Sequence, residues 1–84
     1  ENPVPSENQM ITVRLYGLIR LETGIKELQV QADSVKTLQK ELTRWVPEEK
    51  IKGCVLIVGG KPANSRTKLQ DGDEVMLMPP VAGG

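Results

Sequence analysis

The residues of this chain whose types and order can do chemistry lie at its C-terminus. The last six are Pro79, Pro80, Val81, Ala82, Gly83 and Gly84. They place the terminal carboxylate of Gly84 on an uncharged segment with small side chains, which makes that carboxylate a candidate reactive group. Proline fixes its own φ angle and favours extended backbone before it, so the pair at 79–80 predicts a stiff stem. Glycine has no Cβ atom, so the backbone at 83–84 can enter a channel too narrow for other residues. The segment therefore predicts a tail that inserts into another protein, and a frayed chain end is the alternative.

Composition limits the sites that the rest of the chain can form. A chain of 84 residues makes one small domain with little room for an enclosed active site. It has no His and a single Cys, which removes the commonest general base and any internal disulfide. Its formal net charge is zero, so it lacks the basic field that attracts a phosphate backbone, and we expect no nucleic-acid partner. No stretch has the length of a membrane span and no signal sequence is evident, so we expect a cytoplasmic protein with no membrane partner.

The N-terminal part of the chain predicts a β-hairpin after an unstructured start. Residues 1–9 are polar and contain two prolines, and we interpret them as a disordered leader or an expression remnant, with Met10 as a candidate original start. Residues 11–16 alternate between apolar and polar types, the pattern of a strand with one buried face. Residues 27–31 alternate in the same way after a connection that contains two glycines. The two segments predict antiparallel strands joined by a long loop.

One amphipathic helix is predicted between Ser34 and Pro47. Asp33 or Ser34 can accept hydrogen bonds from the first free amides of such a helix. The apolar positions that follow at spacings of three and four are Val35, Leu38, Leu42 and Trp45. These positions predict a single buried helix face.

Three strands are predicted after the helix. Residues 54–58 form a continuous apolar run, typical of a central strand covered on both faces or of a strand at a partner interface. The glycines at 59–60 predict a turn, and residues 61–69 supply a short edge strand and a loop. A turn at 71–73 precedes the last strand, 74–78, whose alternation places Val75 and Leu77 inward and Met76 and Met78 outward.

This order of elements predicts an α+β fold, a mixed sheet of four to five strands with one main helix packed across one face. The domain spans residues 10–78 and the tail spans residues 79–84. If the first and last strands are neighbours, their outward side chains share one face of the sheet. Those side chains belong to Arg14, Tyr16, Met76 and Met78. Methionine makes adaptable apolar contacts, so we interpret these four as a candidate partner patch, although single exposed apolar residues are also ordinary.

Three further groups are interpreted as structural. Cys54 lies in the most apolar segment, where burial raises the pKa of a thiol, so we predict an inert side chain. Asp71, Asp73 and Glu74 lack the spacing of a calcium loop, and the sequence Asp71-Gly72-Asp73 is typical of a turn. Residues 59–61 lack the flanking glycine and the hydroxyl of a phosphate-binding loop. We therefore predict no metal site.

Three segments of the chain resemble the MoaD/ThiS family of sulfur carriers and, within it, the small subunits of molybdopterin synthase. They are the terminal PPVAGG, the segment Leu69 to Val75 and, more weakly, residues 20–24. The resemblance covers Met10 to Gly84. Members of this family have the ubiquitin-like β-grasp fold, which agrees with the order of strands and helix predicted above.

The resemblance implies a mechanism and its partners. A ubiquitin-activating-type enzyme adenylates the Gly84 carboxylate with ATP, and a sulfur donor converts the acyl-adenylate to a thiocarboxylate. The tail then inserts into the large subunit of molybdopterin synthase, where the sulfur attacks a pterin precursor of the molybdenum cofactor. Residues 79–82 form the stem, Gly83 allows passage and Gly84 carries sulfur. By the same resemblance the chain binds no cofactor, supplies no acid, base or metal, and assembles as two small with two large subunits.

Two departures and two alternatives accompany the resemblance. The glycines at 59–60 stand where many relatives carry Asn-Gly, and both pairs suit a tight turn. The absence of Phe leaves Met and Tyr to make the partner contact. One alternative is a carrier for thiamine synthesis, tRNA thiolation or conjugation to lysines of other proteins. The other is a ubiquitin-like binding module whose terminus does no chemistry.

Overall fold

The computed structural model describes residues 9–79. The predictions for residues 1–8 and for the tail from Pro80 to Gly84 lie outside the described residues. Within residues 9–79 the elements are β1 (Met10–Leu15), α2 (Gly17–Thr23), β2 (Glu27–Gln31), α3 (Val35–Leu42), α4 (Glu48–Lys52), β3 (Val55–Val58), β4 (Lys61–Pro62) and β5 (Glu74–Met78).

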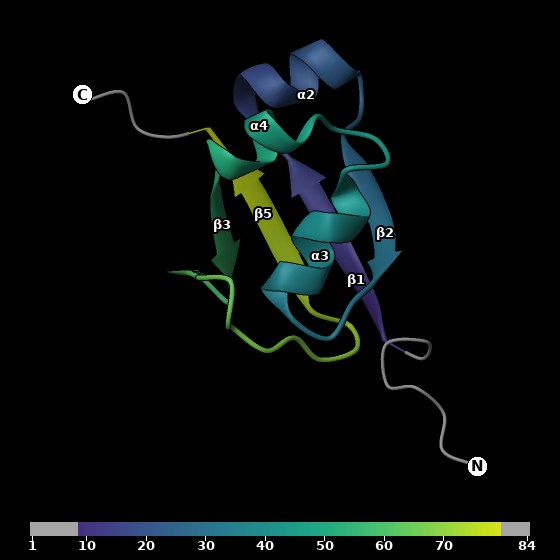
Figure 1. Cartoon of the computed structure of the whole chain (residues 1–84), viewed down its shortest axis with the longest axis vertical. Helices are drawn as coiled ribbons and strands as arrows, with labels where there is room; N and C mark the ends of the chain where they lie inside the picture. The colour runs from purple at the N-terminus through teal and green to yellow at the C-terminus, as the bar shows by residue number, and fades with distance from the viewer. Residues whose placement is uncertain (1–8, 80–84) are drawn as a thin grey trace.

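The strands form one mixed sheet in the order β2-β1-β5-β3-β4. The first and last strands are parallel neighbours, with Val13 paired to Val75 and Leu15 to Leu77. The other three pairings are antiparallel. Helix α3 lies across one face of the sheet (Figure 1). This arrangement confirms the predicted α+β class and the mixed sheet with one main helix.

The core lies between that face of the sheet and the helices. The inward positions of the two central strands, Ile11, Val13, Leu15, Val75 and Leu77, are each at most 1% exposed, which confirms the predicted alternation. The remaining buried side chains are those of Ile19, Val30, Ala32, Val35, Leu38, Leu42, Val46, Ile51, Leu56 and Leu69. Removing this apolar surface from water is the main free-energy gain of folding.

Helix α3 begins as predicted. Ser34 is its N-cap, and the Ser34 side chain accepts a hydrogen bond from the Thr37 amide at 3.3 Å. Asp33 contributes as well, because its carboxylate accepts a hydrogen bond from the Thr37 hydroxyl at 3.2 Å. Leu38 and Leu42 are fully buried.

The predicted continuation of this apolar helix face to Trp45 is wrong. The helix ends at Leu42 and is followed by a turn. Trp45 is 43% exposed, whereas Val46 is 1% exposed. Because the backbone leaves regular helical geometry after Leu42, a spacing of three no longer keeps a residue on the buried face.

Two short helices were not predicted. Helix α2 occupies the segment that was expected to be a long loop, and α4 connects α3 to β3. Each buries a single side chain, Ile19 in α2 and Ile51 in α4. Helices of this length are unstable alone, so packing against the domain decides whether they form. The segments of α2 and α4 are two helical turns or shorter, so their apolar residues do not repeat often enough to predict a helix from the sequence.

Strand β3 carries the continuous apolar run. It lies between β5 and the two-residue edge strand β4. Leu56 faces the core, whereas Val55 and Ile57 are only half-buried, so the strand is not covered on both faces. The turn predicted after it is confirmed, with positive φ angles at both Gly59 and Gly60.

We predict that two leucine-to-alanine substitutions on helices of this domain differ greatly in their effect on stability. Leu42→Ala removes a fully buried side chain and should lower the free energy of unfolding by about 2–5 kcal/mol. Leu21→Ala, on α2, truncates a side chain that is 79% exposed and should change the free energy of unfolding by about 0.5 kcal/mol or less. Urea unfolding followed by circular dichroism measures both. Equal losses would contradict the core described above.

Candidate functional site

The face of the sheet opposite α3 carries a group of apolar side chains. Met76 and Met78 point outward from β5 and are half-buried, as predicted. Across the antiparallel pairing with β3, Met76 lies opposite Ile57 and Met78 lies opposite Val55. Side chains of directly opposed residues lie on the same face and within contact range. We call these four residues the outer patch.

The two β3 residues of the outer patch were not among the predicted site residues. Their signal in the sequence was the unbroken apolar run at 54–58, for which a partner interface was one of two interpretations. Within the residues that the structure describes, the other interpretation, a strand covered on both faces, is wrong, because Val55 and Ile57 are only half-buried. A partner interface at β3 stays a prediction.

Arg14 forms a charged border to the outer patch. It is paired with Met76 across the parallel β1–β5 ladder. Its Nη2 atom lies 3.2 Å from Glu74 Oε2 and 3.7 Å from Glu27 Oε1, and all three side chains are about half exposed. Exposed ion pairs of this kind contribute at most about 1 kcal/mol. A carboxylate of a partner can therefore replace either glutamate at little cost in stability.

Tyr16 extends the same face beyond the end of β1. Its backbone is still extended, with φ −130° and ψ 161°, and its amide donates a hydrogen bond to the Leu77 carbonyl oxygen at 3.0 Å. Extended backbone alternates its side chains, so Tyr16 shares the face of Arg14. The structure thus places all four predicted patch residues on one face of the sheet. Their role in binding stays a prediction.

The base of the tail lies at the end of the sheet where α2 and α4 pack. Strands β1 and β5 both point toward this end (Figure 1). Pro79, the one tail residue that the structure describes, is exposed and borders an open cavity of about 200 Å³. The other residues that line the cavity are Leu18, Ile19, Glu22, Lys50, Gly53 and Cys54. The cavity was not predicted from the sequence because most of its lining comes from the two unpredicted helices and from the residue that ends α4.

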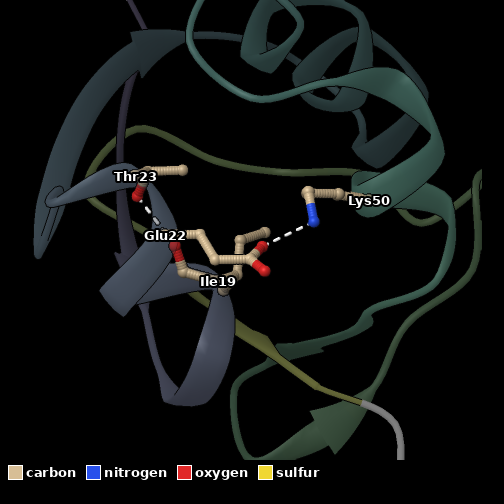
Figure 2. Close-up of polar contacts among 4 residues, drawn as sticks. All are labelled: Ile19, Glu22, Thr23 and Lys50. Atoms are coloured by element: carbon tan, nitrogen blue, oxygen red, sulfur yellow. Dashed lines mark hydrogen bonds and ion pairs between the residues drawn. The ribbon is translucent and has the colours of Figure 1, made fainter.

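An ion pair joins α2 to α4 at this cavity. Lys50 Nζ donates a hydrogen bond to Glu22 Oε1 at 2.5 Å, and Figure 2 shows the two side chains pointing toward each other. The hydrogen bond to Glu22 and its negative charge raise the pKa of Lys50 above its ordinary value. A raised lysine pKa means that the contribution of the pair is present at neutral pH and is lost as pH rises through that raised value.

Cys54 is half-buried at the same cavity and packs against the core from its edge. Burial raises the pKa of the Cys54 thiol, and the nearby charge of Lys50 opposes that shift more weakly. Because the thiolate is the nucleophilic form of cysteine, the raised pKa keeps this side chain poorly reactive near neutral pH.

The turn predicted before β5 is confirmed at Asp71 and Gly72, and its two aspartates bind backbone amides. Asp71 Oδ1 accepts a hydrogen bond from the Met10 amide, and Asp73 Oδ2 accepts one from the Gln70 amide, each at 2.8 Å. Among residues 9–79 no group of three or more His, Cys, Asp or Glu side chains is arranged to hold a metal ion. None of the helices in the same range is long and apolar enough to cross a membrane.

Comparison with known proteins gives a family and a set of similar folds. Residues 13–84 match the ThiS family. No curated protein matches the chain. The chain is similar to a solved protein-protein complex of subunits 1 and 2 of molybdopterin-converting factor from Helicobacter pylori, with 29% identity, a TM-score of 0.69 and coverage of 90% of this chain and 100% of that one.

Two further solved structures share the fold at lower identity. A putative molybdopterin converting factor subunit 1 from Pyrococcus furiosus is 23% identical, with a TM-score of 0.73 and coverage of 87% of this chain and 99% of that chain. The small archaeal modifier protein 1 from Methanosarcina acetivorans is also 23% identical, with a TM-score of 0.76 and coverage of 90% and 97%. At these identities the likeness shows the fold alone.

We predict that the Cys54 thiol reacts with iodoacetamide more slowly in the folded protein than in the unfolded chain. At pH 8 the raised pKa leaves a smaller thiolate fraction in the folded state, and partial burial restricts access. The difference in rate should narrow as pH rises through the raised pKa. Mass spectrometry of the alkylated chain with and without urea measures both rates. Equal rates at pH 8 would contradict the environment described for this thiol.

Proposed function

Because this chain belongs to the ThiS family of ubiquitin-like sulfur carriers, we propose that it is the sulfur-carrier small subunit of molybdopterin synthase. The observation that carries the proposal is the family match itself, which runs from residue 13 to Gly84 and so includes the glycine terminus. The similarity to the Helicobacter pylori complex of subunits 1 and 2 supports the molybdopterin branch of the family.

The proposed reaction begins with activation of the terminal carboxylate. A carboxylate is a poor electrophile because its negative charge is delocalised over two oxygens. A ubiquitin-activating-type partner therefore joins one oxygen of Gly84 to the α-phosphate of ATP, which releases pyrophosphate. A sulfur donor then replaces the adenylate, which leaves as AMP, and the terminus becomes a thiocarboxylate. The sulfur of that group is the nucleophile that attacks the pterin precursor in the large subunit.

The contribution of this chain is to bind the partner and to position the terminus. Holding two reacting groups in a fixed geometry replaces a bimolecular encounter by a step within one complex. The outer patch supplies an apolar contact surface, and Arg14 supplies a charge at its border. Pro79 to Ala82 form the stem that spans the distance from the sheet to the reacting centre, and Gly83 and Gly84 enter the channel.

The proposed partner is the large subunit, in an assembly of two small and two large chains. Four outward side chains on neighbouring strands form the kind of compact apolar centre around which protein interfaces are built. The charged residues that border it on the side of β1, Arg14, Glu27 and Glu74, suit part of the polar rim of such an interface.

A protein-modifier role is the competing proposal within the same family. It shares the activation step and differs in the acceptor, which is a lysine amine in place of a pterin precursor. No feature of residues 9–79 favours it, and the archaeal modifier protein is similar at 23% identity, which shows fold alone. The experiment below separates the two by the acceptor that receives the activated terminus.

We predict that deleting Gly84, or adding one alanine after it, abolishes sulfur transfer and leaves the fold intact. Both changes displace the reactive carboxylate, whereas the core of the part that the structure describes runs from Ile11 to Leu77. Intact mass spectrometry after incubation with ATP, an adenylating enzyme and a sulfur source should show one oxygen replaced by sulfur in the unaltered chain only.

The acceptor is then tested by mixing the sulfur-loaded chain with the large subunit and a pterin precursor. Loss of the sulfur with formation of a dithiolene product is the expected result. Full transfer activity in the Gly84 deletion would contradict the carrier role. A loaded chain that forms an amide with lysines and leaves the pterin unchanged would favour the modifier role.

We also predict that Met76→Asp weakens binding to the large subunit by about tenfold or more, since it puts a charge at the apolar centre of the interface. Its cost in the free energy of unfolding should be near 1 kcal/mol, the range of strand preferences at outward positions. Ser65→Asp is the matched control, because it adds the same charge in an exposed loop that contacts the start of α3. Calorimetry and urea unfolding measure the two effects. A large stability loss with unchanged binding would show that Met76 serves the fold only.

A further inference from the structure

Gly17 and Pro79 leave the sheet together. In the parallel β1–β5 ladder Leu15 is paired with Leu77, and the Tyr16 amide donates to the Leu77 carbonyl oxygen. Continuing that register by two residues brings Gly17 opposite Pro79. At this point the two chains part, because β1 turns into α2 while β5 continues into the tail.

The contact between the two residues requires that position 17 be a glycine. A Cβ atom on Gly17 would lie 2.7 Å from Pro79 Cγ, 3.0 Å from Cδ and 3.7 Å from Cβ. Contacts below 3.0 Å are essentially never seen for real Cβ atoms, so one of the two residues would have to move. The proline ring is closed onto its own backbone and cannot rotate away. Relief of the overlap therefore moves the backbone at the start of the tail.

The helix that carries Gly17 is fixed on its other sides. Ile19 is 5% exposed and anchors α2 in the core. Glu22 forms an exposed ion pair with Lys50 of α4. Within α2 itself, Thr23 Oγ1 donates a hydrogen bond to the Ile19 carbonyl oxygen at 2.8 Å (Figure 2). Gly17 and Pro79 are both exposed, but Gly17 lies two residues before the buried Ile19, whereas Pro79 follows the last strand that the structure describes. A larger residue at 17 would thus displace the tail before it displaced the helix.

We propose that Gly17 is a positioning residue, which lets Pro79 seat against the start of α2 and so sets the direction in which the reactive terminus leaves the domain. What the terminus delivers rests on the proposed function above. The contact between Gly17 and Pro79 is inferred only from the geometry of residues 15–17 and 77–79.

The chain contains a matched control for this proposal. Gly24 closes the other end of α2 with φ +74°, close to the +67° of Gly17, and a Cβ there would meet nothing within 4 Å. Because both φ angles are positive, alanine at either position carries a left-handed backbone strain. Gly17→Ala alone adds the overlap with Pro79. The double variant Gly17→Ala/Pro79→Ala removes Cγ and Cδ and leaves the 3.7 Å contact, which is an ordinary separation.

The first arm of the test uses the isolated protein. Nuclear magnetic resonance should show a contact between the Gly17 Hα atoms and the Pro79 ring in the unaltered chain. Relative to the unaltered chain, the amide signals from Val81 onward should shift in Gly17→Ala and stay unchanged in Gly24→Ala. The same signals in the double variant should match those of Pro79→Ala alone. Urea unfolding should show that the two substitutions are coupled, with Gly17→Ala costing less stability when residue 79 is alanine.

The second arm measures the rate at which the terminus acquires sulfur with ATP, the adenylating enzyme and a sulfur source. Gly17→Ala should lower kcat/KM about tenfold or more, since a misplacement near 1 Å can cost about 100-fold. Gly24→Ala should stay within about twofold of the unaltered chain, because it places no atom near the tail. The double variant should recover most of the loss relative to Pro79→Ala.

Two results would overturn the proposal. If Gly17→Ala and Gly24→Ala had equal effects on the amide signals, the stability and the rate of sulfur acquisition, Gly17 would serve only the structure of α2. If the effects of Gly17→Ala on the free energy of unfolding and on the amide signals of the tail were the same with and without Pro79→Ala, the contact between residues 17 and 79 would not set the direction of the tail. If the unaltered chain acquires no sulfur, the proposed function fails, and the first arm still decides whether Gly17 directs the tail.

Discussion

The parallel pairing of β1 with β5 is the constraint on which the rest of the molecule depends. It brings the first and last strands together in the middle of the sheet and makes them point to the same end. Parallel neighbours need a long crossover, and here the whole intervening chain supplies it, with α3 covering the face on which the core forms. The same pairing decides where the tail begins, since Pro79 directly follows the end of β5. One pair of strands thus sets both the centre of the sheet and the point at which the tail begins.

Because the strands are pleated, the side chains on one face of the sheet fill the core and those on the other face point outward. Alternate residues of β5 either fill the core, as Val75 and Leu77 do, or face outward, as Met76 and Met78 do. Met76 and Met78 can therefore serve a partner without weakening the interior. Arg14 repeats this division on β1, where its neighbours Val13 and Leu15 are buried.

Sequence reasoning succeeded where periodicity was long and failed where it was short. The alternation at 11–15 and 74–78 and the helical spacing from Val35 to Leu42 predicted the sheet, its inward residues and its main helix, because each pattern extends over several repeats. Helices α2 and α4 each bury one side chain, so no repeat exists from which to read them. Trp45 was misplaced because the helix ended one turn early. The cavity beside Pro79 and the fit of Gly17 against it depend on contacts between elements far apart in the chain, which local pattern does not contain.

The position of β5 also has a consequence for how the protein is made. Among residues 9–79 this strand is the last element along the chain, yet it lies between β1 and β3 and contributes two fully buried side chains to the core. Before residues 74–78 have been synthesised, β1 and β3 have no neighbour in common and the centre of the sheet is missing. Pairing between segments so far apart in sequence is slow compared with local helix formation. The sheet is therefore complete only when the strand that leads into the tail is in place, because that strand alone joins the β2–β1 pair to the β3–β4 pair.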